Sequence, residues 1–125
     1  MSALGDAEAH LAKAREFYET AEMTLDLGLF SAATSNAVTS GINSKDAICL
    51  KLTGKTGRAQ NHTEAVIELQ EAGKDGAAAA PQLRRLLNSK TKAQYQSTPI
   101  ARREAEQSLE RARSMLEVAQ RVVVQ

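Results

Sequence analysis

The sequence predicts a single all-α domain, an up-and-down bundle of four to five helices that takes up residues 1–125. Helix breakers are rare, since only 2 prolines and 7 glycines occur in 125 residues. Alanine, the strongest helix former, is frequent, whereas aromatic residues, which favour strands, make up 3% of the chain. Apolar residues also recur at spacings of three and four, the period of a helix with one buried face.

Two long segments of this kind begin the chain. The first is expected over residues 6–27 and the second over residues 31–52. In the second segment Ala33, Ala37 and Gly41 lie four residues apart, so these small residues share one face. A glycine inside a helix costs about 1 kcal/mol relative to alanine, and we therefore expect a close approach of another helix at Gly41.

The next two helices are predicted from their ends. Asn61 is expected to cap a short helix, because Glu64 follows at the spacing of a capping box, and Gly73 ends that helix. The following residues are expected to form a connection that drifts into helix, with Pro81 in the first turn of a fourth helix. That helix fades near Tyr95.

The last helix has the most regular pattern. Thr98 is its expected N-cap and Pro99 lies in its expected first turn. Its apolar residues alternate spacings of four and three, as in a heptad seam: Ala105, Leu109, Ala112, Leu116, Ala119 and Val123. Such a seam faces either the core of the bundle or a partner subunit.

Several classes of protein are excluded by composition. Cys49 is the only cysteine, which excludes a disulfide framework and a cysteine-based zinc site, and we expect it to be an inert buried thiol. No apolar run approaches ~20 residues, so no membrane span is expected. No export signal is visible, and the expected location is the cytoplasm. His10 and His62 belong to different predicted helices, so neither a metal site nor a cofactor is predicted.

The net charge of +1 conceals an uneven distribution of charge. Residues 47–63 and 76–103 contain lysines and arginines but no acidic residue. In an up-and-down bundle, the connections after the second and fourth helices lie at the same end. The sequence therefore predicts one basic end, composed of Lys51, Lys55, Arg58, His62, Lys90, Lys92, Tyr95, Arg102 and Arg103.

A basic end of this kind is typical of an anion-binding site. Clustered like charges destabilise a fold unless an anion offsets them, and the start of the third helix would add free backbone N–H groups. The predicted ligand is the phosphate of RNA or of a nucleotide, or an acidic protein partner. The alternative is that these side chains are ordinary solvated loop residues.

The order of several short stretches resembles that of a HEPN domain, a family of small α-helical bundles. The resemblance spans about residues 8–120. It rests on residues 25–33 (LDLGLFSAA), 41–49 (GINSKDAIC), 61–66 (NHTEAV) and 86–95 (LLNSKTKAQY), which are followed by the long final helix.

The resemblance implies a function for a protein of this kind. Many HEPN proteins are metal-independent RNases, often toxins paired with a nucleotidyltransferase-like antitoxin. They commonly form homodimers in which two copies of a motif meet, an arginine followed after four to six residues by a histidine. The resemblance implies that the histidine performs acid–base chemistry and that the arginine holds the phosphate.

This sequence lacks that motif. Arg58 is separated from His62 by three residues, and no arginine precedes His10. No catalytic residue is therefore predicted, and the first hypothesis is a non-catalytic HEPN-like module that binds its ligand through the basic end, by analogy in a toxin–antitoxin or defence system. One alternative is a metal-independent endoribonuclease with an altered site that uses His62 and Arg58. Another is a scaffold that only dimerises through its final helix.

Overall fold

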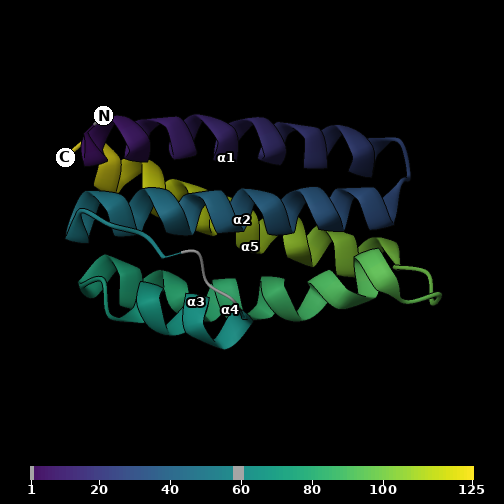
Figure 1. Cartoon of the computed structure of the whole chain (residues 1–125). Coiled ribbons are helices and arrows are strands. Elements are labelled where there is room, and N and C mark those ends of the chain that lie inside the picture. Colours follow the sequence, from purple (N-terminus) through teal and green to yellow (C-terminus); the bar gives the residue numbers. More distant parts are fainter. Residues whose placement is uncertain (1, 58–60) are drawn as a thin grey trace.

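The computed structural model describes residues 2–57 and 61–125, and these residues fold into five helices without any strand. The helices are α1 (Ala3–Asp26), α2 (Phe30–Thr53), α3 (His62–Gln70), α4 (Lys74–Tyr95) and α5 (Arg102–Val123). The four long helices lie side by side, and the short α3 lies against α4 (Figure 1). The prediction of an all-α bundle is confirmed.

The long helices alternate in direction, but α3 does not take part in the alternation. After α2 ends, the chain turns back along the bundle before α3 begins, so α3 runs in the same direction as α2 (Figure 1). At 1.5 Å per residue, the 9 residues of α3 span about 13 Å, whereas the 24 residues of α2 span about 36 Å. Therefore α3 is an insertion between two antiparallel neighbours, α2 and α4.

Three helix ends have clear caps, and one of these, Asn61, is as predicted. Asn61 caps α3, because its side-chain oxygen accepts the N–H of Glu64 at 2.9 Å. Gly54 ends α2 in the left-handed conformation (φ = 79°), which glycine adopts without steric cost. Ser2 caps α1 earlier than predicted, since its hydroxyl accepts the N–H of Gly5 at 3.0 Å.

Two predicted helix starts are wrong. The fourth helix begins at Lys74 and runs through Pro81, which lies on an exposed face where water can satisfy the carbonyl that proline leaves unpaired. The last helix begins at Arg102, so Thr98 and Pro99 lie in the preceding loop.

The core is built around α2, which packs against α1, α4 and α5. Gly41 is buried there, and a Cβ at this position would lie 2.6 Å from Leu86 Cδ1 and 3.4 Å from Met115 Sδ. The predicted close approach at Gly41 is confirmed, because α4 and α5 contribute side chains that occupy the space of the missing Cβ.

The apolar seam of α5 faces this core. Ala105, Ala112 and Ala119 are fully buried within the chain itself, and Leu109 is 5% exposed. The seam therefore faces the core of the bundle, the first of the two alternatives stated for it.

Two further features bear on the expectations drawn from composition. Burial raises the pKa of the Cys49 thiol to about 11, so this cysteine remains protonated and inert, as predicted. Within the described ranges of the chain, none of the helices combines the length and apolar character needed to cross a bilayer.

Candidate functional site

The predicted basic end does not exist as a single cluster. The ammonium group of Lys51 donates to the carbonyl oxygens of Val123 (3.2 Å) and Gln125 (2.6 Å), at the end of α5. Lys92 instead pairs with Glu104 at 2.8 Å, at the start of α5. Val123 follows Glu104 by 19 residues, so Lys51 and Lys92 are separated by about 28 Å along the bundle.

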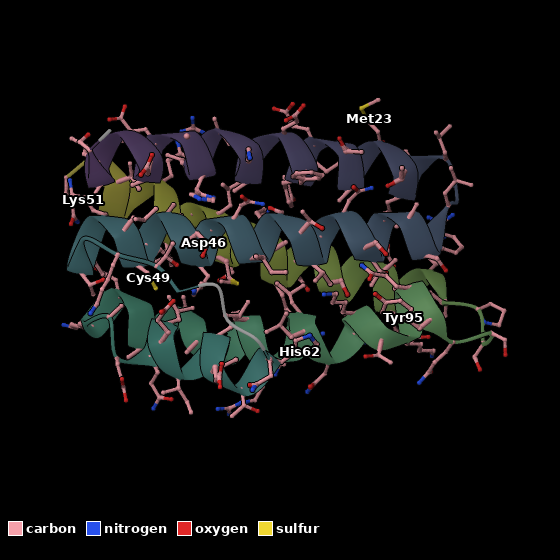
Figure 2. The ribbon with its side chains drawn as sticks, in the orientation of Figure 1. Met23, Asp46, Cys49, Lys51, His62 and Tyr95 are labelled. Atoms are coloured by element: carbon pink, nitrogen blue, oxygen red, sulfur yellow. The ribbon has the colours of Figure 1, made fainter. Side chains whose placement is uncertain are left out.

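The other predicted residues follow the same division. Lys55 lies near Lys51, because its backbone N–H donates to Thr53 at the end of α2. Three further predicted residues lie with Lys92 at the opposite end of the bundle: Tyr95, Arg102 and Arg103. Tyr95 and Arg103 are exposed, and the guanidinium of Arg102 lies 4.8 Å from the centroid of the Phe30 ring. Lys51 and Tyr95 mark the two ends in Figure 2. Arg58 lies outside the described residues.

The prediction of one basic end is wrong because of α3. The connection after α2 and the connection after α4 would share an end only if α3 crossed the whole bundle. Since α3 is short and runs parallel to α2, the connections lie at opposite ends (Figure 1).

Two of the predicted residues, His62 and Lys90, do lie together, in a cleft along the side of the bundle. This cleft has a volume of about 590 Å³ and is bordered by α1, α2, α3, α4 and the loop after α2. Its lining is His10, Ile42, Lys45, Asp46, Thr56, Gly57, Asn61, His62, Ala65, Leu83, Leu87 and Lys90. In Figure 2, Asp46 lies on α2 and His62 lies at the start of α3. A hollow of about 510 Å³ between α4 and α5 contains neither histidine.

The hydrogen bonds of His10 determine which of its ring nitrogens is protonated. Nδ1 lies 2.9 Å from the side-chain oxygen of Asn43, and the Asn43 amide nitrogen donates to the carbonyl of Thr39 at 3.0 Å. The Asn43 oxygen can only accept, so Nδ1 carries the proton. In the neutral ring Nε2 therefore keeps its lone pair and is the nitrogen that can accept a proton or a hydrogen bond.

A buried lysine lies at one side of the cleft. Lys45 is 2% exposed, and its ammonium group donates to Thr56 Oγ1 (2.9 Å), Asp46 Oδ1 (3.3 Å) and Glu68 Oε1. Burial by itself would lower the pKa of Lys45, but the bond to Glu68 and the charge of Asp46 outweigh it and raise that pKa. Lys45 therefore remains a cation in the folded protein.

The same side chains fasten the loop that follows α2. The hydroxyl of Thr56 donates to Asp46 Oδ1 at 2.6 Å, and the N–H of Gly57 donates to Glu68 Oε2 at 2.8 Å and Oε1 at 3.0 Å. Burial by itself would raise the pKa of Glu68, but the bonds from Lys45 and Gly57 outweigh it and lower that pKa. Glu68 is therefore an anion that ties the loop to α2 and α3.

The arrangement can bind an anion and can move a proton, and it shows no metal centre. Among residues 2–57 and 61–125, no group of three or more His, Cys, Asp and Glu side chains is placed to hold a metal ion. Lys90 and His62 supply hydrogen-bond donors, and His10 supplies a proton acceptor. Such groups suit a phosphate-bearing ligand.

The family model of the HEPN domain matches residues 7–122 of this sequence. The chain belongs to the HEPN domain family. The match covers nearly the whole of the five-helix bundle, and the expected HEPN fold is confirmed. No relative of this HEPN domain was found among curated proteins.

Sequence reasoning missed six residues in and around the site of this HEPN domain, of which Asn43 and Lys45 are buried and the others partly exposed: His10, Asn43, Lys45, Asp46, Thr56 and Glu68. A signal for Lys45 was present. Continuing the spacing of four from Ala33, Ala37 and Gly41 leads to Lys45, which places a charged residue on the most buried face of α2. Such a charge needs a partner, and Asp46 and Glu68 provide it.

Proposed function

We propose that this HEPN domain binds a phosphate group of RNA or of a nucleotide in the cleft between α1, α2, α3 and α4. The observation that carries this proposal is the convergence of His10, His62 and Lys90, from three different helices, on one cleft. The N-terminal end of α3 borders the same cleft through Asn61, and a helix N-terminus favours an anion. An acidic protein partner is the competing ligand of the first hypothesis.

The two ends of the bundle are weaker candidates than the cleft. The ammonium groups of Lys51 and Lys92 already donate to carbonyl oxygens and to Glu104, and Arg102 stacks on Phe30. A phosphate bound there would compete with these contacts, whereas Lys90 and His62 border open space in the cleft.

Removing the ammonium group of Lys90 is expected to weaken the binding of a labelled RNA oligonucleotide or of AMP. Lys90→Ala should raise the dissociation constant about 10-fold, the equivalent of one charge-assisted hydrogen bond. The affinity of the unchanged protein should fall steeply as salt rises, because phosphate binding releases counterions. Fluorescence anisotropy for RNA and calorimetry for AMP measure both effects.

Lys92→Ala is the matched control. Lys92 has the same charge on the same helix but faces Glu104 rather than the cleft. An equal loss of affinity in both variants would contradict the cleft as the binding site. Binding of an acidic protein in the absence of any RNA or nucleotide binding would favour the competing ligand.

A second candidate function is metal-independent cleavage of RNA, which the placement of His10 favours. His10 Nε2 would take the proton of a ribose 2′-hydroxyl, and the 2′ oxygen would attack the phosphorus. The bond from phosphorus to the 5′ oxygen would break, and protonated His62 would give its proton to that oxygen. The products would be a 2′,3′-cyclic phosphate and a 5′-hydroxyl. The proposed pair is His10 and His62, because both line the cleft, whereas Arg58 of the sequence-based alternative lies outside the described residues.

Incubation of the protein with RNA and a chelator tests this second candidate. Cleavage is expected to yield 2′,3′-cyclic phosphate ends and to disappear in both His10→Ala and His62→Ala, since each reaction needs a base and an acid. RNA that is bound but remains intact would leave binding as the function of this site.

The setting of this activity is an inference from the family alone. We propose by analogy that the domain belongs to a toxin–antitoxin or defence system, acts as a homodimer and pairs with a nucleotidyltransferase-like antitoxin. Sedimentation of the purified protein and co-purification with the product of a neighbouring gene test these expectations.

A further inference from the structure

The carboxylate of Glu68 lies where several hydrogen-bond donors converge. Its Oε1 accepts from Lys45 Nζ and from the N–H of Gly57, and its Oε2 accepts from the same N–H. Thr56 Oγ1 also lies 3.3 Å from Oε1, but its one proton is donated to Asp46 Oδ1 at 2.6 Å. The two remaining donors form an anion seat, which we define as Lys45 Nζ and the N–H of Gly57.

The ammonium donor of the anion seat is fixed, but the carboxylate that occupies the seat is not. The Lys45 side chain is 3% exposed, so the fold holds its ammonium group in place. The Glu68 side chain is 35% exposed, and rotation about its own bonds would carry the carboxylate into solvent. Lys45 can therefore lose Glu68 without moving, whereas the Gly57 N–H, which donates to Glu68, needs another anion in the same place.

The chemistry of the seat is that of a phosphate site. An ammonium group and a glycine N–H are donors with which proteins hold phosphate oxygens. Lys45, Thr56 and Gly57 also line the cleft that contains His62 and Lys90. The seat is thus continuous with the surface to which the phosphate-bearing ligand is assigned.

We propose that Glu68 occupies a phosphate subsite of the cleft, and that a phosphate group of the ligand displaces its carboxylate from the anion seat. This inference rests on the proposed function, because the anion seat would be a second phosphate-binding position in the same cleft. Asp46 remains beside Lys45 and its charge opposes a second anion, so phosphate replaces the carboxylate rather than joining it. Glu68 therefore weakens binding in the unchanged protein, as a built-in competitor.

Glu68→Ala vacates the seat and provides the test, with inorganic phosphate as the probe. Phosphate should bind Glu68→Ala about 10-fold more tightly than it binds the unchanged protein, since no carboxylate must first leave. The amide signal of Gly57 should shift on titration in an NMR spectrum of labelled protein. Equal affinities, or tighter binding without a shift of Gly57, would overturn the proposal.

Two further variants test whether the gain in affinity depends on the anion seat. Glu71→Ala removes an exposed carboxylate at the end of the same helix, and it should bind phosphate like the unchanged protein. Adding Lys45→Met to Glu68→Ala should abolish the gain; retention of the gain would overturn the proposal. If Glu68→Ala does not fold, Glu68→Gln takes its place, because it preserves the shape of the side chain and removes its charge.

Titrations with AMP and with an RNA oligonucleotide identify the source of the phosphate and separate this proposal from the proposed function. If the unchanged protein binds neither while Glu68→Ala gains phosphate binding at Gly57, the proposed function fails and the anion seat stands. If the unchanged protein binds RNA or AMP through Lys90 and Glu68→Ala gains nothing, the seat fails and the proposed function stands.

Discussion

Replacing Lys45 by methionine is expected to destabilise the folded protein by roughly 2–4 kcal/mol at pH 7. Breaking a fully buried ion pair costs about 3–5 kcal/mol, and we take a lower range because water screens the partly exposed Glu68. Methionine fills most of the space of the lysine chain, so the loss comes from charge. Without the ammonium group, the carboxylates of Asp46 and Glu68 face one another around Thr56.

The pH dependence of this loss follows from the two pKa shifts. The pKa of Glu68 is lowered in the fold, so its stabilisation is present above the ordinary glutamate pKa and is lost as pH falls through the folded value. The pKa of Lys45 is raised, so its stabilisation is present below the ordinary lysine pKa and is lost as pH rises through the folded value. The ion pair therefore contributes fully between about pH 5 and pH 10.

Urea denaturation of Lys45→Met and of the unchanged protein at pH 7 and at pH 3 measures this effect. The difference in unfolding free energy should shrink at pH 3, because protonated carboxylates need no cation. Lys90→Met is the matched control: its lysine borders the same cleft but is only partly buried, and its loss should be below about 0.5 kcal/mol. If Lys45→Met lowers the free energy of unfolding by the same amount at pH 7 and at pH 3, packing rather than charge is responsible for the loss of stability.

The elements of this fold were predictable from local rules, whereas one feature of its topology was not read correctly. Asn61 and the seam of α5 are visible as spacings in the sequence, because caps and apolar faces depend on residues within a few positions of each other. The error concerned which ends of the helices meet. The predicted ends of α3, Asn61 and Gly73, already excluded a full crossing, since the eleven residues between them span about 17 Å, less than half the length of α2.

The candidate site was predicted only in its exposed part for a related reason. His62 and Lys90 can be predicted because bases without neighbouring acids are visible in the sequence. Two hydrogen-bond partners of Lys45, Thr56 and Glu68, are 11 and 23 residues away in the sequence. Contacts of that kind depend on where the returning loop places them, and no spacing rule encodes the path of a loop.

The assignment of the α5 seam to the core makes Leu109 the most informative residue of that helix. Leu109 is 5% exposed and lies between α1 and α5, beside Tyr18 and Leu25. Leu109→Ala should cost about 2–5 kcal/mol, because it removes buried methyl groups and leaves a cavity. The neighbouring seam residues Ala105 and Ala112 are too small to fill that cavity.

Denaturant titrations of Leu109→Ala, of the exposed control Glu110→Ala and of the unchanged protein provide the measurement. The control should change stability by less than about 0.5 kcal/mol, since it alters only a solvated position on a helix. A loss below about 1 kcal/mol for Leu109→Ala would mean that this face of α5 is outside the core. The titrations should also be repeated at several protein concentrations. A seam within one chain gives a midpoint independent of concentration, whereas a seam shared between two subunits gives a midpoint that rises with concentration.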